Sequence, residues 1–136
     1  MIWLLDSVTI IHALNGQGRC LKRLNSAPTR GRVATSILAV AEVYYGVENS
    51  RRRDENLQRV HRELELFDIY PVTLQTARIY AQIRVAAERA GRSKGSSGKI
   101  DLLLAATAIE NDAVLVTHDA GLLDKAIPEL QVEDWY

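Results

Sequence analysis

The 136-residue sequence is poor in cysteine and has no long apolar run. Its one cysteine, Cys20, cannot form an internal disulfide or supply a cysteine pair for zinc, which fits a reducing compartment. The apolar run from Ile2 to Leu5 has no basic flank and ends at Asp6, so it predicts a buried strand rather than a signal peptide or a membrane span. We therefore expect a cytoplasmic protein with no membrane association.

The sequence also has no excess of positive or of negative charge. Because 17 lysines and arginines balance 17 aspartates and glutamates, no overall field draws the protein toward polyanions. Any binding of nucleic acid must then come from local patches. The hydrophobic content of 47% over this length is sufficient for one compact core without disulfides, and we expect a single domain over residues 1–136.

Short apolar runs alternate with helical patterns along the chain. Strands are predicted at about 2–5, 33–34, 69–72, 113–116 and 130–132, and helices at about 7–14, 18–26, 36–47, 52–66, 73–90 and 101–111. We expect Ser7 to cap the first helix, and Pro71 to place the third strand near an edge or end of the sheet. Since parallel neighbours require crossover connections, this alternation predicts an α/β fold of three layers, with a central, mainly parallel sheet of four to five strands.

Four acidic residues lie in or at the end of apolar segments: Asp6, Glu42, Asp101 and Asp119. Asp6 and Asp119 each follow a predicted strand, and ligands of parallel sheets bind at the carboxyl ends of strands, so we expect these two side chains to be neighbours. Two carboxylates about 4 Å apart repel by roughly 4 kcal/mol at an effective dielectric near 20. A cluster of four must therefore protonate or bind cations.

The acids favour a hard divalent cation. Magnesium or manganese takes oxygen ligands and often uses only one or two direct carboxylates, whereas zinc is disfavoured because the three histidines are scattered. A carboxylate site with open water positions suits hydrolysis of phosphodiesters. Ser7 and Thr117 adjoin Asp6 and Asp119, where their hydroxyls can donate hydrogen bonds to carboxylates or to phosphate oxygens.

The motifs that carry these acids resemble those of one family. LLDS is similar to its leading strand with the first aspartate, AEVYYGV to its helix with a glutamate before a glycine, and IYAQIR to its long penultimate helix. IDLLLAATA followed by VLVTHD resembles its third aspartate with a two-alanine helix, and then a strand that ends in threonine, any residue, and aspartate or asparagine. In this order the motifs cover nearly the whole chain, which thus resembles the PIN-domain ribonucleases and, among them, toxins of the VapC and FitB type.

This resemblance implies a magnesium- or manganese-dependent endoribonuclease with a PIN-like fold, acting on transfer, ribosomal or messenger RNA. It also implies a small DNA-binding antitoxin as partner, whose tail enters a groove of the toxin, and both homodimers and toxin–antitoxin hetero-oligomers. Asp6 and Asp101 would be direct metal ligands, and Glu42 and Asp119 would act through water or a second ion. The chain departs from the family at Val8, where asparagine or serine is usual, and in the glycine- and serine-rich stretch 95–99.

Each acid also has an ordinary structural explanation. Asp6 can cap a helix, Asp101 can complement a helix N-terminus, Glu42 can pair with an arginine, and Asp119 can begin a turn. Two other classes of protein stay open on these grounds. One is a non-catalytic module of the same fold that binds a partner, and the other is a phosphorylated receiver-type switch, although the acid pair and the late lysine of such switches are lacking.

Four basic residues lead into the segment that carries Asp101: Arg84, Arg92, Lys94 and Lys99. We expect these four to contact RNA, because they adjoin the predicted site. The basic run at 50–53 is more typical of a solvated helix face. His118 lies beside Asp119, and alternation along a strand predicts that its side chain points away from the site.

Overall fold

The protein is described by a computed structural model, which covers residues 1–91, 98–118 and 126–136. Within these residues a single sheet of five parallel strands has the order β3-β2-β1-β4-β5. The strands are β1 (Ile2–Leu5), β2 (Arg32–Ser36), β3 (Asp68–Tyr70), β4 (Val114–Val116) and β5 (Val132–Glu133). Because β1 pairs with β2 on one side and with β4 on the other, the chain changes direction across the sheet at β1, which is where ligands of such sheets bind.

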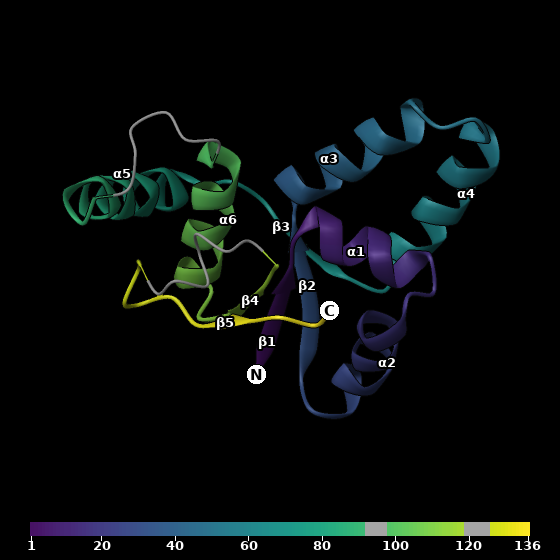
Figure 1. The fold of residues 1–136 in the computed structure, drawn as a ribbon, viewed down its shortest axis with the longest axis horizontal. Coiled ribbons are helices and arrows are strands. Elements are labelled where there is room, and N and C mark those ends of the chain that lie inside the picture. The colour runs from purple at the N-terminus through teal and green to yellow at the C-terminus, as the bar shows by residue number, and fades with distance from the viewer. Residues whose placement is uncertain (92–97, 119–125) are drawn as a thin grey trace.

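Helices cover both faces of this sheet, as Figure 1 shows. The helical elements are α1 (Ser7–Leu14), α2 (Gly18–Ser26), the short 3-10 helix η1 (Ala27–Thr29), α3 (Ile37–Glu48), α4 (Arg53–Leu64), α5 (Leu74–Arg89) and α6 (Lys99–Glu110). Helices α1 to α4 lie on one face and α5 and α6 on the other, which confirms the predicted three-layer α/β/α fold. None of the helices in the described ranges has the length and apolar character needed to cross a bilayer.

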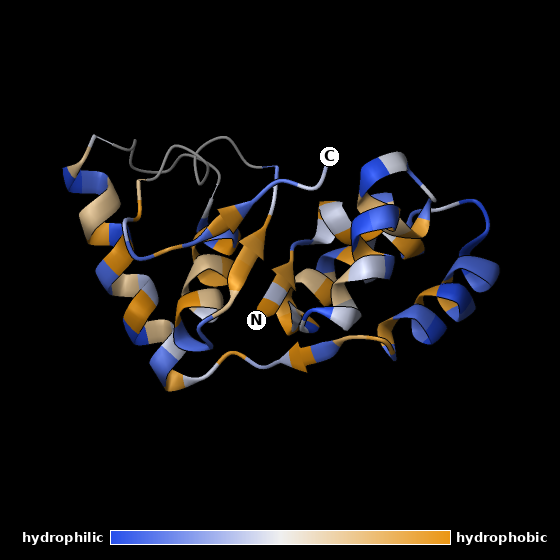
Figure 2. Ribbon diagram, turned by 90° about the horizontal axis from the view of Figure 1, so that it is seen from below, coloured by the Kyte–Doolittle hydropathy of each residue, from blue (hydrophilic) through white to orange (hydrophobic). Residues whose placement is uncertain are grey.

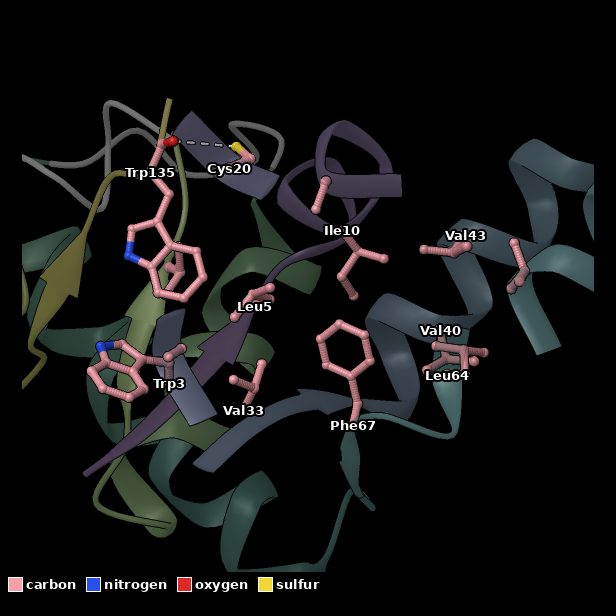
Figure 3. Close-up of a cluster of buried hydrophobic side chains, with 14 of the residues drawn as sticks. Trp3, Leu5, Ile10, Cys20, Val33, Val40, Val43, Leu64, Phe67 and Trp135 are labelled. Atoms are coloured by element: carbon pink, nitrogen blue, oxygen red, sulfur yellow. Dashed lines mark hydrogen bonds between the residues drawn. The ribbon is translucent and has the colours of Figure 1, made fainter. Parts of the chain in front are cut away.

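The sheet separates two apolar cores, because successive side chains of a strand point to opposite faces. Trp3 and Leu5 pack with residues of α1 to α4 and with Phe67 in the first core, part of which is drawn in Figure 3. Leu4 and Leu115 pack with α5 and α6 in the second core. The central strands accordingly stand out as apolar in Figure 2, whereas the covering helices also carry hydrophilic residues.

The ends of several elements differ by a few residues from the sequence prediction, and two of these differences have a clear physical cause. Asp6 caps α1, and the expectation that Ser7 does so is wrong: Oδ1 of Asp6 accepts a hydrogen bond from the backbone N–H of Thr9 at 2.8 Å. The third strand ends at Tyr70 and does not reach Val72. Since Pro71 has no N–H to donate, it cannot extend the ladder, and β3 lies at the edge of the sheet as predicted.

We expect Leu115→Ala to lower the free energy of unfolding by about 2–5 kcal/mol, because it opens a cavity at a fully buried position of a central strand. Leu74→Ala is the matched control, since the Leu74 side chain is 92% exposed and its loss should change stability by less than about 0.5 kcal/mol. Urea denaturation followed by circular dichroism measures both. Equal losses in the two variants would contradict the described core.

Candidate active site

A pocket of about 360 Å³ lies at the carboxyl ends of β1 and β4. The residues that line it are Asp6, Ser7, Val8, Glu42, Asp101, Leu104, Thr117, His118 and Tyr136. The pocket therefore brings together three of the four predicted acids, from the end of β1, the middle of α3 and the first turn of α6. Asp119, the fourth, lies outside the described residues.

Asp6 is held in place through both of its carboxylate oxygens. While Oδ1 caps α1, Oδ2 accepts a hydrogen bond from Oγ1 of Thr117, which follows β4, at 2.5 Å. The backbone N–H of Asp6 also donates to the carbonyl oxygen of Val116 at 3.1 Å. With only 9% of its surface exposed, Asp6 has its orientation fixed by two neighbouring strands. The capping role and a role in the pocket are thus compatible, because each oxygen keeps a second lone pair.

Glu42 lies in the middle of α3 and is partly buried. The hydroxyl of Ser7 donates to its Oε2 at 2.6 Å, so the residue after Asp6 orients the second carboxylate of the pocket. Within the described parts of the chain no arginine or lysine forms an ion pair with Glu42, so the structure gives no support to the buried salt bridge that would explain it otherwise.

Asp101 is partly buried in the first turn of α6. A carboxylate at this position interacts favourably with the positive end of the helix dipole, so its structural explanation holds as well. The helix behind it is fixed by the second apolar core, to which Leu102, Leu104 and the following alanines contribute. Asp101 is therefore presented to the pocket from a well-packed element.

The chemistry of the lining residues fits a magnesium or manganese ion. The pocket wall has three carboxylates, and among the described residues that line it none is lysine or arginine. Within the described ranges, however, no three acidic, histidine or cysteine side chains are arranged so that they could hold one metal ion together. A hard cation that keeps several waters can take only one or two carboxylates directly. Asp6 and Asp101 are the candidates for that contact, with Glu42 acting through water.

Two aromatic side chains also line the pocket. His118 lines the pocket, so the expectation that it points away is wrong, because the strand alternation ends with β4 at Val116. Tyr136 was missed by the sequence analysis. A signal was available, since a final parallel strand beside β4 delivers the residues after it to the same edge of the sheet. Burial and the nearby charge of Asp6 raise the pKa of the Tyr136 hydroxyl above its ordinary value of 10.0.

The predicted RNA-binding residues are not brought to the pocket as far as the structure describes them. Arg84 donates to Glu88 at 3.2 Å and to the Tyr80 hydroxyl at 2.9 Å on its own helix, and these hydrogen bonds raise its pKa. Lys99 is exposed at the start of α6 and does not line the pocket. Arg92 and Lys94 lie outside the described residues. A contact with RNA at these four positions stays a prediction.

Known proteins resemble this chain over nearly its whole length. The model of the PIN domain matches residues 3–128. Ribonuclease VapC2 of Rickettsia felis is 29% identical over 136 residues, which are 99% of this chain and 98% of the relative. The crystal structure of VapBC2 from Rickettsia felis bound to a DNA fragment from their promoter matches with a TM-score of 0.87 at 27% identity, covering 100% of both chains. The crystal structure of FitAcB from Neisseria gonorrhoeae matches with a TM-score of 0.76 at 30% identity, over 97% of this chain and 96% of the other.

We expect Thr117→Val to lower the free energy of unfolding by about 1–3 kcal/mol, because it removes a hydrogen-bond donor from the buried carboxylate of Asp6 at nearly constant volume. The control is Thr29→Val, which removes an exposed hydroxyl that donates to the carbonyl oxygen of Ser26. Chemical denaturation at neutral pH compares the two. If Thr117→Val costs no more stability than the control, the hydrogen bond does not hold Asp6.

Proposed function

Because this chain belongs to the PIN-domain family and resembles its VapC and FitB members, we propose that it is a metal-dependent endoribonuclease, the toxin of a toxin–antitoxin pair. The observation that carries the proposal is the pocket lined by Asp6, Glu42 and Asp101, with no lysine or arginine in that part of its lining which the structure describes. A pocket with several negative carboxylates repels the phosphates of RNA unless a cation is bound in it. The activity should therefore depend on Mg²⁺ or Mn²⁺.

In this proposal the residues of the pocket have different roles. A bound Mg²⁺ or Mn²⁺ would supply an activated water and neutralise the charge that develops on the phosphate. Asp6 and Asp101 would hold the ion directly, and Glu42 and Asp119 would orient water around it. Thr117 and the N–H of Thr9 fix the direction of the Asp6 oxygens, so that the site needs little rearrangement when the ion enters.

The proposed partner is a small antitoxin that binds DNA, as the promoter-bound VapBC2 complex of Rickettsia felis suggests. A groove of about 270 Å³ between α1, α3 and α4 supports this part of the proposal. Its wall is mainly apolar and includes Ile11, Leu14, Val43, Val47 and Val60. An amphipathic segment of the antitoxin can bury its apolar side chains there. Homodimers and hetero-oligomers with the antitoxin belong to the same proposal.

The test is cleavage of single-stranded RNA by the purified protein with Mg²⁺ or Mn²⁺, compared with a sample treated with a chelator. We expect cleavage to require the ion, and Asp101→Asn to lower kcat/KM by about 100-fold or more, because a ligand carboxylate is lost. Asp112→Asn is the matched control. Asp112 is an exposed aspartate just beyond the other end of α6, at a φ of 51° that asparagine tolerates equally well, and its replacement should leave kcat/KM unchanged.

Two results would count against the proposal. Cleavage that persists at full rate in the chelator-treated sample or in Asp101→Asn would show that the pocket is not the active site. Binding of RNA or of an antitoxin without any cleavage by the wild-type protein would instead support the non-catalytic module.

A further inference from the structure

The wall of the acidic pocket has an aromatic side that metal chemistry does not require. His118 follows β4 and Tyr136 follows β5, and both line the pocket beside Asp6 and Asp101. The Tyr136 ring contacts the His118 ring with a centroid distance of 4.3 Å and the His12 ring of α1 with a centroid distance of 4.4 Å. Three rings from three different segments therefore form a row at the pocket.

Hydrogen bonds hold two members of this row, His118 and Tyr136. Asp134 connects two of its members, since Oδ2 lies 2.7 Å from Nδ1 of His118 and Oδ1 accepts from the backbone N–H of Tyr136 at 2.9 Å. A guanidinium nitrogen of Arg19 donates to the carbonyl oxygen of Tyr136, also at 2.9 Å. These contacts reduce the pKa of the Asp134 carboxyl below its ordinary value of 3.8, although burial acts in the opposite direction.

The neighbouring Trp135 anchors the same segment in the core. Trp135 is only 2% exposed, and its indole N–H donates to Glu133 at 2.8 Å. Its carbonyl oxygen accepts a hydrogen bond from the Cys20 thiol at 3.3 Å, and Figure 3 marks this contact with a dashed line. The contacts of a buried tryptophan thus hold the backbone next to Tyr136. Rings held in this way lose little conformational freedom when they bind a planar partner.

One ring of the row is open to solvent. The His118 side chain is 60% exposed although one side of its ring lies against Tyr136. From this geometry we infer that His118, supported by Tyr136 and His12, is a stacking site for an unpaired nucleobase of the RNA, adjacent to the phosphate that is cleaved. The inference rests on the proposed ribonuclease function and adds to it the part of the substrate that the aromatic side contacts.

Stacking suits this position for an electrostatic reason. The carboxylates of Asp6, Glu42 and Asp101 repel the RNA backbone, and the described lining residues include no lysine or arginine to offset this. Contact between an aromatic ring and a base does not depend on the charge of the backbone, and proteins commonly hold splayed bases of single-stranded RNA on tyrosine and histidine rings. The aromatic side can therefore retain a nucleotide next to the acids.

The test measures RNA binding in the Asp101→Asn background, so that no cleavage is needed. Fluorescence anisotropy gives Kd for a short single-stranded RNA and for a series of the same RNA with one abasic position each. We expect His118→Ala to raise Kd for the intact RNA about ten-fold, and one abasic position to raise it by a similar factor in the parent. For His118→Ala, the abasic change at that same position should cause no further rise in Kd, because the substitution and the missing base remove the same contact. His118→Tyr, which keeps a ring, should restore most of the affinity.

The control is His61→Ala. The His61 ring packs edge-on against Tyr44 at a centroid distance of 5.5 Å on α3 and α4, outside the acidic pocket, so its loss should leave every Kd unchanged. The inference is overturned if His118→Ala binds intact RNA as tightly as its parent. It is also overturned if His118→Ala raises Kd by the same factor for the intact RNA and for every abasic RNA. Neither result depends on whether the wild-type protein cleaves RNA, so this test and that of the proposed function can fail separately.

Discussion

The two hydrogen bonds to the carboxylate of Asp6 connect the fold to the site. One oxygen caps α1 and the other accepts from Thr117 at the end of β4, so the same side chain begins a helix, joins two central strands and faces the pocket. The topology makes this possible, because β1 and β4 are adjacent parallel strands although they are far apart in sequence. Removing either contact would therefore affect both the packing of the sheet and the geometry of the acids.

Mutual repulsion is the constraint that such a pocket must satisfy. Three carboxylates from separate elements are kept near one another by the packing of α3 and α6 on opposite faces of the sheet. The apolar cores provide the free energy that holds them there, and a bound divalent cation would relieve the repulsion. The aromatic side of the pocket would complement this arrangement, because stacking on a base does not depend on the charge of the RNA backbone.

Much of the fold and part of the site could be predicted from the sequence. The alternation of apolar runs with helical patterns identified the parallel sheet, and three of the four acids in apolar surroundings, Asp6, Glu42 and Asp101, line one pocket. The Ser7 cap was wrong because cap preferences do not distinguish adjacent polar residues such as Asp6 and Ser7. The row of His12, His118 and Tyr136 could not be predicted, since it depends on how the segment after β5 packs against α1.

The central claim is that these carboxylates form one divalent-metal site. Its most direct test is the affinity for Mn²⁺, measured without RNA from the electron paramagnetic resonance signal of the free ion. We expect the wild-type protein to bind Mn²⁺, and Asp6→Asn to bind it at least about ten-fold more weakly. An Asp6→Asn variant that stays folded and binds Mn²⁺ as tightly as the wild type would contradict the claim.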